Sequence, residues 1–177
     1  MKKLLCLVSL FGICLTLQAQ SYLGIVKKTA NFRHKPSMSA PKIAILQKDA
    51  QVFIISKTET NDYYHVIDVE SNSEGYIYTS FVQLGKPLPP TENGLFTQVG
   101  RTMSSETIIR VFNKSEKTVS LVLNDNKYEF TSGKKEVLKL EQGNYSFRVS
   151  SPGMVPEYGL QTIERGYEYI WSFTREW

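Results

Sequence analysis

Two histidines and two neighbouring glutamates are the first residues in this sequence to consider for chemistry. His34 and His65 stand at unrelated spacing, with no cysteine near either that could complete a metal site. Glu164 and Glu168 flank an expected tight turn, where paired carboxylates could serve as the acid and base of a glycosidase. Surface or turn roles for the histidines, and edge charges on a sheet for the glutamates, are the simpler interpretations. The sequence therefore predicts no metal site and no catalytic pair.

The motifs of several enzyme classes are also missing. Both cysteines, Cys6 and Cys14, lie in an N-terminal segment that we expect to be removed, so the mature chain would lack a thiol nucleophile. There is no Gly-x-Ser-x-Gly elbow, and Ser132-Gly133-Lys134-Lys135 lacks the earlier glycine of a phosphate-binding loop. These absences predict a protein that is not an enzyme and carries no cofactor.

The N-terminal segment has the layout of a signal peptide. Lys2 and Lys3 precede an apolar run from Leu4 to Leu17, and Ala19 follows at the expected cleavage position. The run is shorter than the roughly 20 apolar residues that span a membrane. We therefore expect residues 1–19 to be cleaved near Ala19, leaving a periplasmic or secreted protein without a stable membrane span.

The charge balance argues against nucleic-acid binding. The 177-residue chain has a formal net charge of +4, and loss of Lys2 and Lys3 would lower it to about +2. Lys27-Lys28 and Lys134-Lys135 are isolated pairs, and no cluster of basic residues with interleaved aromatic residues is present. We expect no nucleic-acid partner.

The stretch from Ala30 to Val82 carries several motifs in a set order. An Asn-apolar-Arg opening and a turn precede an aromatic-rich strand, a Gly-aromatic strand and a final turn: Asn31-Phe32-Arg33, Lys35-Pro36-Ser37, Asp62-Tyr63-Tyr64-His65-Val66, Gly75-Tyr76-Ile77-Tyr78 and Thr79-Ser80-Phe81-Val82. Together they resemble the bacterial SH3 (SH3b) family over about residues 23–84. The resemblance implies a small β-barrel that binds cell-wall or peptide material and performs no chemistry.

Aromatic residues are the main candidates for ligand contact in this segment. Alternation along a strand places Tyr63 on the face opposite Tyr64, and a buried Ile77 leaves Tyr76 and Tyr78 facing away from the core. A tyrosine on an open face offers a flat apolar ring with a hydroxyl group. The predicted ligand-binding residues are Tyr63, Tyr76, Tyr78, Arg33 and His34. The alternative is that these tyrosines cover the core of a small barrel. The family usually has Trp in place of Tyr63 and Tyr76, and Gly in place of Lys35.

A proline-rich segment predicts a boundary between two domains. Pro87, Pro89 and Pro90 fall within residues 85–94, where proline favours an extended, semi-rigid spacer. We therefore expect an SH3b-like domain over residues 22–84, a linker over 85–94 and a second domain over 95–177. The Pro-rich joint predicts that the two domains fold separately.

The second domain shows short apolar segments divided by turn residues. Strands are expected at Thr107–Phe112, Thr118–Leu123, Lys127–Thr131, Glu136–Leu140, Tyr145–Val149, Leu160–Ile163 and Tyr167–Phe173. The pattern of Leu95–Ser105 indicates no particular structure. Tyr167, Tyr169, Trp171 and Phe173 share one face of the last strand, which favours a core, and Trp177 could dock on the sheet or face a partner. The pattern is loosely similar to small immunoglobulin-like or transthyretin-like modules. The whole chain is thus expected to be all-β, with an SH3-like small barrel followed by an antiparallel β-sandwich.

These observations leave two hypotheses of function. The first is an exported, non-catalytic binding protein whose SH3-like domain contacts cell-envelope material, with peptidoglycan peptides as the expected ligand. The second is a structural or assembly subunit that binds other exported proteins through one or both β domains. The sequence alone identifies neither the ligand nor the oligomeric state.

Overall fold

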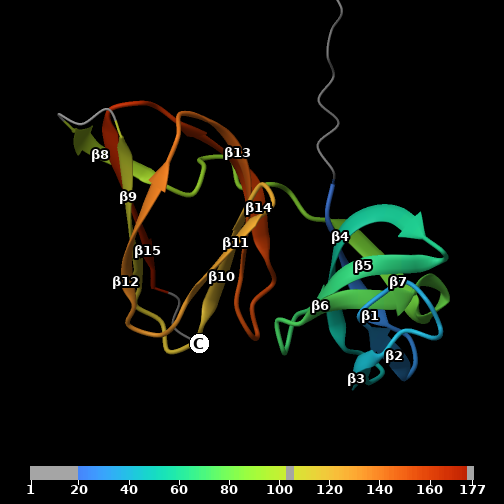
Figure 1. The fold of residues 1–177 in the computed structure, drawn as a ribbon. Coiled ribbons are helices and arrows are strands. Elements are labelled where there is room, and N and C mark those ends of the chain that lie inside the picture. The colour runs from blue at the N-terminus through green and yellow to red at the C-terminus, as the bar shows by residue number, and fades with distance from the viewer. Residues whose placement is uncertain (1–19, 103–105, 175–177) are drawn as a thin grey trace, which may run out of the picture.

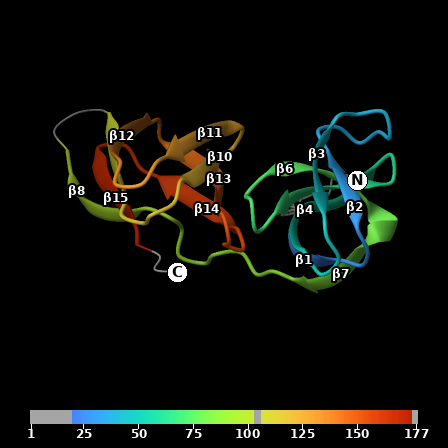
Figure 2. The same cartoon turned by 90° about the horizontal axis from the view of Figure 1, so that it is seen from below.

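The computed structural model describes residues 20–102 and 106–174. Over these ranges the chain is all-β, as predicted, and its one short helix is the 3₁₀ turn η1 (Thr79–Phe81). The predictions for the signal peptide at residues 1–19, for Ser105 and for Trp177 fall outside the described residues. Figures 1 and 2 show two β-rich units side by side, joined by a single crossing of the chain.

The N-terminal unit is one curved, seven-stranded sheet. Its strands are β1 (Tyr22–Val26), β2 (Ala30–Arg33), β3 (Lys42–Leu46), β4 (Gln51–Thr60), β5 (Tyr63–Asp68), β6 (Glu74–Tyr78) and β7 (Val82–Pro87). The spatial order is β3-β2-β6-β5-β4-β1-β7, and all neighbours are antiparallel.

Alternation along β4, β5 and β6 forms the core of this unit. Val52 and Ile54 pack with Tyr64, Val66 and Ile77 inside the curved sheet. The burial of Ile77 was expected from the sequence. Strands β4 and β5 are also apolar on their other face, which carries Phe53 and Ile67. A strand that is apolar on both faces needs cover on both sides, and residues of the C-terminal unit form part of the cover on the second face.

The C-terminal unit consists of two four-stranded sheets with a shared core. One sheet has the order β11-β10-β13-β14 and the other β12-β9-β15-β8. Their bounds are β8 (Thr97–Arg101), β9 (Thr107–Asn113), β10 (Val119–Leu123), β11 (Asn126–Phe130), β12 (Lys135–Leu140), β13 (Gly143–Ser150), β14 (Glu157–Ile163) and β15 (Tyr167–Phe173). Strands β9 and β15 are parallel, and the other described pairs within these sheets are antiparallel.

The aromatic stripe of β15 lies in the core, as predicted. Tyr169 and Trp171 are buried, and Tyr167 and Phe173 pack against the same cluster. The ring of Trp171 meets the rings of Phe96, Phe130 and Phe173 edge to face, at centroid distances of 6.0–6.3 Å. Such contacts add to the burial of apolar area, so this strand anchors the sandwich.

The segment that connects the two units is held by contacts at both ends. Strand β7 continues through Gly85 to Pro87, where a proline is tolerated because β7 is an edge strand. Leu88 then donates its backbone N–H to Ser21, and its carbonyl accepts from the Tyr158 hydroxyl at 2.6 Å. Thr91 forms an isolated bridge to Gly159 of β14. The segment between the units is therefore anchored to both of them.

The two units share an interface with an apolar centre. Phe53, Ile67 and Val69 of the N-terminal unit are buried against Val155 and Tyr158 of the C-terminal unit. The rings of Phe53 and Tyr158 meet edge to face at 6.1 Å. The backbone N–H of Gly153 donates to the carbonyl of Val69 at 2.8 Å. The N-terminal unit thus has a second buried face, which packs against the C-terminal unit.

Candidate functional site

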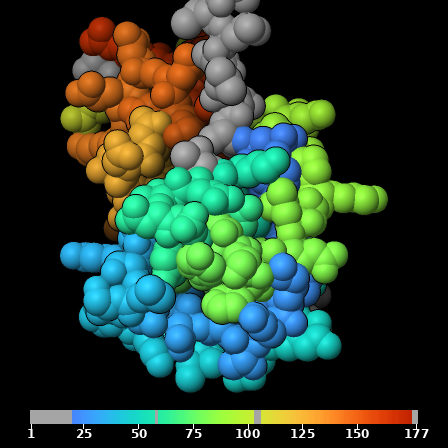
Figure 3. All heavy atoms as spheres, turned by 90° about the vertical axis from the view of Figure 1, so that its right-hand side faces the viewer, coloured from blue at the N-terminus to red at the C-terminus, as the bar shows by residue number. Residues whose placement is uncertain are grey.

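A groove with a volume of about 670 Å³ opens on the N-terminal unit. It is lined by the end of β2, the loop that follows it, the β4–β5 turn and the residues around η1: Asn31, Arg33, Pro36, Ser37, Met38, Asn61, Asp62, Tyr63, Tyr78 and Phe81. Figure 3 views this unit from the side away from the sandwich, where the green residues after β6 lie between teal and blue segments. We call this feature the aromatic groove.

Three rings form the apolar part of the aromatic groove. Tyr63 of β5 and Tyr78 of β6 are register partners, and their rings meet edge to face at 5.3 Å. The ring centroid of Phe81 in η1 lies 5.8 Å from that of Tyr78, and the two ring planes are inclined by 57°. Cross-strand pairing therefore sets one contact, and the short helix after β6 brings the third ring alongside.

A tight turn holds one wall of the groove. Thr60 and Tyr63 are paired, so Asn61 and Asp62 alone form the β4–β5 loop, with φ angles of 51° and 64°. Two residues with positive φ define a type I′ turn, which matches the right-handed twist of the flanking strands and favours Asn and Asp. The Asn61 side-chain amide donates to the Pro36 carbonyl at 3.3 Å. The turn thus fixes Asp62 at the groove and tethers the loop opposite.

Arg33 holds the other wall. Its Nη1 donates to the carbonyl of Ala40 at 2.6 Å, so the half-buried guanidinium is fixed against the loop between β2 and β3. Arginine has five N–H donors. The remaining donors make Arg33 a directional contact for a carbonyl or carboxylate of a ligand.

The five predicted ligand-binding residues separate into two groups. Arg33, Tyr63 and Tyr78 line the aromatic groove, whereas His34 and Tyr76 do not. His34 is exposed beyond the end of β2, and Tyr76 stacks on His65 with ring centroids 4.7 Å apart. Tyr63 is only 5% exposed, so it does not stand on an open face as expected. Its ring is instead packed against the ring of Tyr78.

Sequence reasoning missed Asp62, Met38 and Phe81 as groove residues. The Asn61-Asp62 pair between two apolar segments is a signal for a two-residue hairpin turn and could have placed Asp62 beside Tyr63. Met38 is 81% exposed at the rim of the groove. No local pattern identifies Met38, because its position depends on how the loop between β2 and β3 folds back over the sheet.

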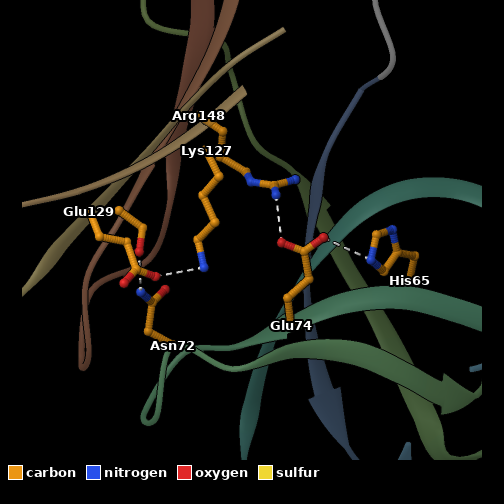
Figure 4. A network of polar contacts seen from close by, with 7 residues as sticks. His65, Asn72, Glu74, Lys127, Glu129 and Arg148 are labelled. Carbon is orange, nitrogen blue, oxygen red and sulfur yellow. Dashed lines mark hydrogen bonds and ion pairs between the residues drawn. The ribbon is translucent and has the colours of Figure 1, made fainter. Parts of the chain in front are cut away.

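A second polar cluster joins the two units, and Figure 4 shows it. Glu74 of β6 contacts the Nε2 of His65 at 2.9 Å and the guanidinium of Arg148 in β13 at 2.7 Å. Asn72 donates to the Ser120 hydroxyl of the sandwich at 3.4 Å. This interdomain polar cluster borders the apolar interface, and its geometry indicates a structural role.

The electrostatics of this cluster favour the ionised carboxylate. Burial raises the pKa of Glu74, but the hydrogen bond from His65 and the charges of Arg148, His65 and Lys127 outweigh it, so the pKa lies below its usual value. Burial lowers the pKa of Arg148, and the charge of Glu74 acts in the opposite direction. The lowered pKa of the Glu74 carboxyl is opposite in direction to the raised carboxyl pKa that a general acid requires.

Within the described ranges, no group of three or more His, Cys, Asp or Glu side chains is arranged to hold a metal ion. The described part of the chain also has no helix that is both long and apolar enough to cross a membrane. No family model, curated protein or solved structure matches this chain.

Proposed function

We propose that this protein is an exported, non-catalytic binding protein whose aromatic groove holds short peptides of the bacterial cell envelope, such as the peptide stems of peptidoglycan. The observation that carries the proposal is the convergence of Arg33, Tyr63 and Tyr78 on one groove. Binding sites for small ligands combine apolar walls with a few fixed polar groups, and this groove has both.

The form of the groove favours a peptide. Its aromatic rings accept an apolar or aliphatic side chain, and Arg33 supplies N–H donors for a backbone carbonyl or a carboxylate. The resemblance of Ala30–Val82 to the SH3b family supports cell-wall material as the source of that peptide. The C-terminal unit would hold the N-terminal unit in place through the shared interface.

Two variants in one strand test this proposal. Tyr78→Ala removes the central ring of the groove, and Tyr76→Ala is its matched control, since both residues are half-buried in β6 and Tyr76 lies outside the groove. Central aromatic contacts can contribute about 2 kcal/mol or more to binding, which corresponds to roughly 30-fold. We expect Tyr78→Ala alone to lose co-sedimentation with purified peptidoglycan.

The opposite outcomes are also informative. Retention of peptidoglycan by Tyr78→Ala would refute the groove as the binding site. If the wild-type protein ignores peptidoglycan and instead captures another exported protein, the protein is an assembly subunit and the proposal is wrong. Thermal unfolding of both variants verifies that any loss of binding is not a loss of fold.

A further inference from the structure

We propose that the aromatic groove selects peptides that carry a free primary amine, such as the side chain of lysine or of another diamino acid. This inference rests on the proposed function and adds a chemical class of ligand to it. In this arrangement the ammonium group lies between the Asp62 carboxylate and the groove rings, and Arg33 binds a carbonyl or carboxylate of the same peptide. Three features of the groove support it.

The first feature is the set of rings. Tyr63 and Tyr78 are inclined by 79°, and Tyr78 and Phe81 by 57°, so the three rings do not stack on one another. A ring face attracts a cation within about 6 Å through its quadrupole. One face of Phe81 already carries a cation of the chain, since the Lys28 Nζ lies 4.7 Å from its centroid. Because Tyr63 is nearly buried and this face of Phe81 is occupied, the half-buried ring of Tyr78 is the one that we expect to stabilise a ligand ammonium group.

The second feature is the carboxylate of Asp62. Asp62 is the one acidic residue among the described residues that line the groove. The rigid turn holds it there at a φ of 64°, and its backbone carbonyl accepts from the Thr79 N–H at 2.8 Å. Its side chain makes no ion pair or hydrogen bond with the described residues, unlike the carboxylates of Glu74 and Glu168. A cation from outside the chain can therefore pair with it.

The third feature is the positive charge of Arg33, which lines the same groove. Arg33 is anchored to Ala40, and its remaining donors can bind an oxygen acceptor. Met38, at the rim, offers an adaptable apolar surface for the methylene groups of a long side chain. The groove thus has one group for each part of such a ligand. Asp62 can pair with its amine, Arg33 can bind its acceptor, and Met38 can contact its methylene chain.

The test compares two synthetic peptides with acetylated N-termini on the full mature chain by calorimetry: Nα-acetyl-Ala-Glu-Lys and the same peptide with Nε-acetyllysine, which has no free amine. Acetylation removes the charge but keeps the methylene chain. We expect acetylation to weaken binding at least about tenfold, which corresponds to about 1.4 kcal/mol. We also expect 1 M salt to weaken the binding of the free-amine peptide more than that of the acetylated peptide.

A pair of variants locates the effect. Asp62→Asn removes the charge while keeping a residue that tolerates positive φ. Asp49→Asn is the matched control, because Asp49 is also exposed, also has a positive φ of 69° and lies outside the aromatic groove. We expect Asp62→Asn to weaken binding of the free-amine peptide about tenfold and to leave binding of the acetylated peptide unchanged. Asp49→Asn should change the binding of neither peptide.

The inference and the proposed function fail in different ways. Equal binding of both peptides, with loss only on Tyr78→Ala, would overturn amine selection and leave the groove as a peptide site. Failure of the wild-type protein to bind either peptide, together with failure to bind peptidoglycan, would overturn both proposals.

Discussion

At the scale of single residues, Glu74 links the two units through its charged contacts. It pairs with Arg148 across the boundary between the units and with His65 on its own sheet. The Arg148 side chain is only 16% exposed, and its Nε has no partner among the described residues. Leaving a buried charge without its partner is costly, so Glu74 fixes the polar edge of the interface.

The pKa of Glu74 gives this pair a pH dependence. Because the pKa in the folded state lies below the usual value of 4.5, the stabilisation from Glu74 is complete above pH 4.5 and is lost as the pH falls through the lowered pKa. We expect Glu74→Gln to reduce stability by about 1 kcal/mol near neutral pH, given that this carboxylate is partly exposed to solvent. The difference from the wild type should shrink as the pH is lowered through this range.

Chemical denaturation at several pH values measures this difference. Glu129→Gln is a suitable control, since Glu129 forms an exposed ion pair with Lys127 within strand β11. The control should differ little from the wild type. A Glu74→Gln variant whose stability deficit stays constant down to acidic pH would contradict the account.

At the scale of elements, alternation and turn residues predicted most of the C-terminal strands. The turns at Asn124 and Gly166 both have positive φ, as their residue types suggest. Strand β8 was not predicted, because its residues are all exposed and its apolar alternation is absent. Strand β8 forms because it can pair with the edge of β15. The pairing contains a β-bulge, in which Val99 is left unpaired between Gln98 and Gly100.

The groove was predictable only in part for a similar reason. Tyr63 and Tyr78 follow from alternation within paired strands, which is local information. The stacking of His65 on Tyr76, outside the groove, depends on the register between β5 and β6. This register could not be predicted from either strand alone. The position of Met38 depends on loop folding, which leaves no periodic signal.

Two glycines in strands test the packing of the C-terminal sheets. A Cβ on Gly159 would lie 2.8 Å from the Thr91 carbonyl oxygen and 2.9 Å from the ring of Phe147, whereas a Cβ on Gly100 would meet nothing within 4 Å. We expect Gly159→Ala to cost about 1–3 kcal/mol through overpacking. Gly100→Ala should stay within about 0.5 kcal/mol of the wild type. Equal stability of the two variants in denaturant titrations would show that the linker does not pack on β14 as described.

At the scale of the whole molecule, the interface changes the expectation for folding. The proline-rich segment predicts two units that fold separately, but Val155 and Tyr158 of the sandwich form part of the cover over the buried residues Phe53, Ile67 and Val69. A separated N-terminal unit would expose this apolar face to water. We therefore expect the two units to unfold in a single cooperative transition.

Two probes of unfolding test this expectation. Both tryptophans belong to the C-terminal part of the sequence, so their fluorescence reports on that part alone, and amide exchange at Val66 and Ile77 reports on the N-terminal unit. The two probes should give coincident transitions in the wild type. Phe53→Ala, which truncates a fully buried ring at a cost of about 3–5 kcal/mol, should separate them. Separate transitions in the wild type would show that the domains are independent.

We have proposed that the aromatic groove of the N-terminal unit binds an envelope peptide. The most direct test is a titration of the ¹⁵N-labelled mature chain with the peptide Ala-Glu-Lys, followed by amide chemical shifts. Binding in the aromatic groove should produce saturable shifts concentrated at Arg33, Asp62, Tyr78 and Phe81, with little change at Tyr76 or on the sandwich. Shifts centred on the C-terminal sheets, or no shifts at millimolar peptide, would contradict it.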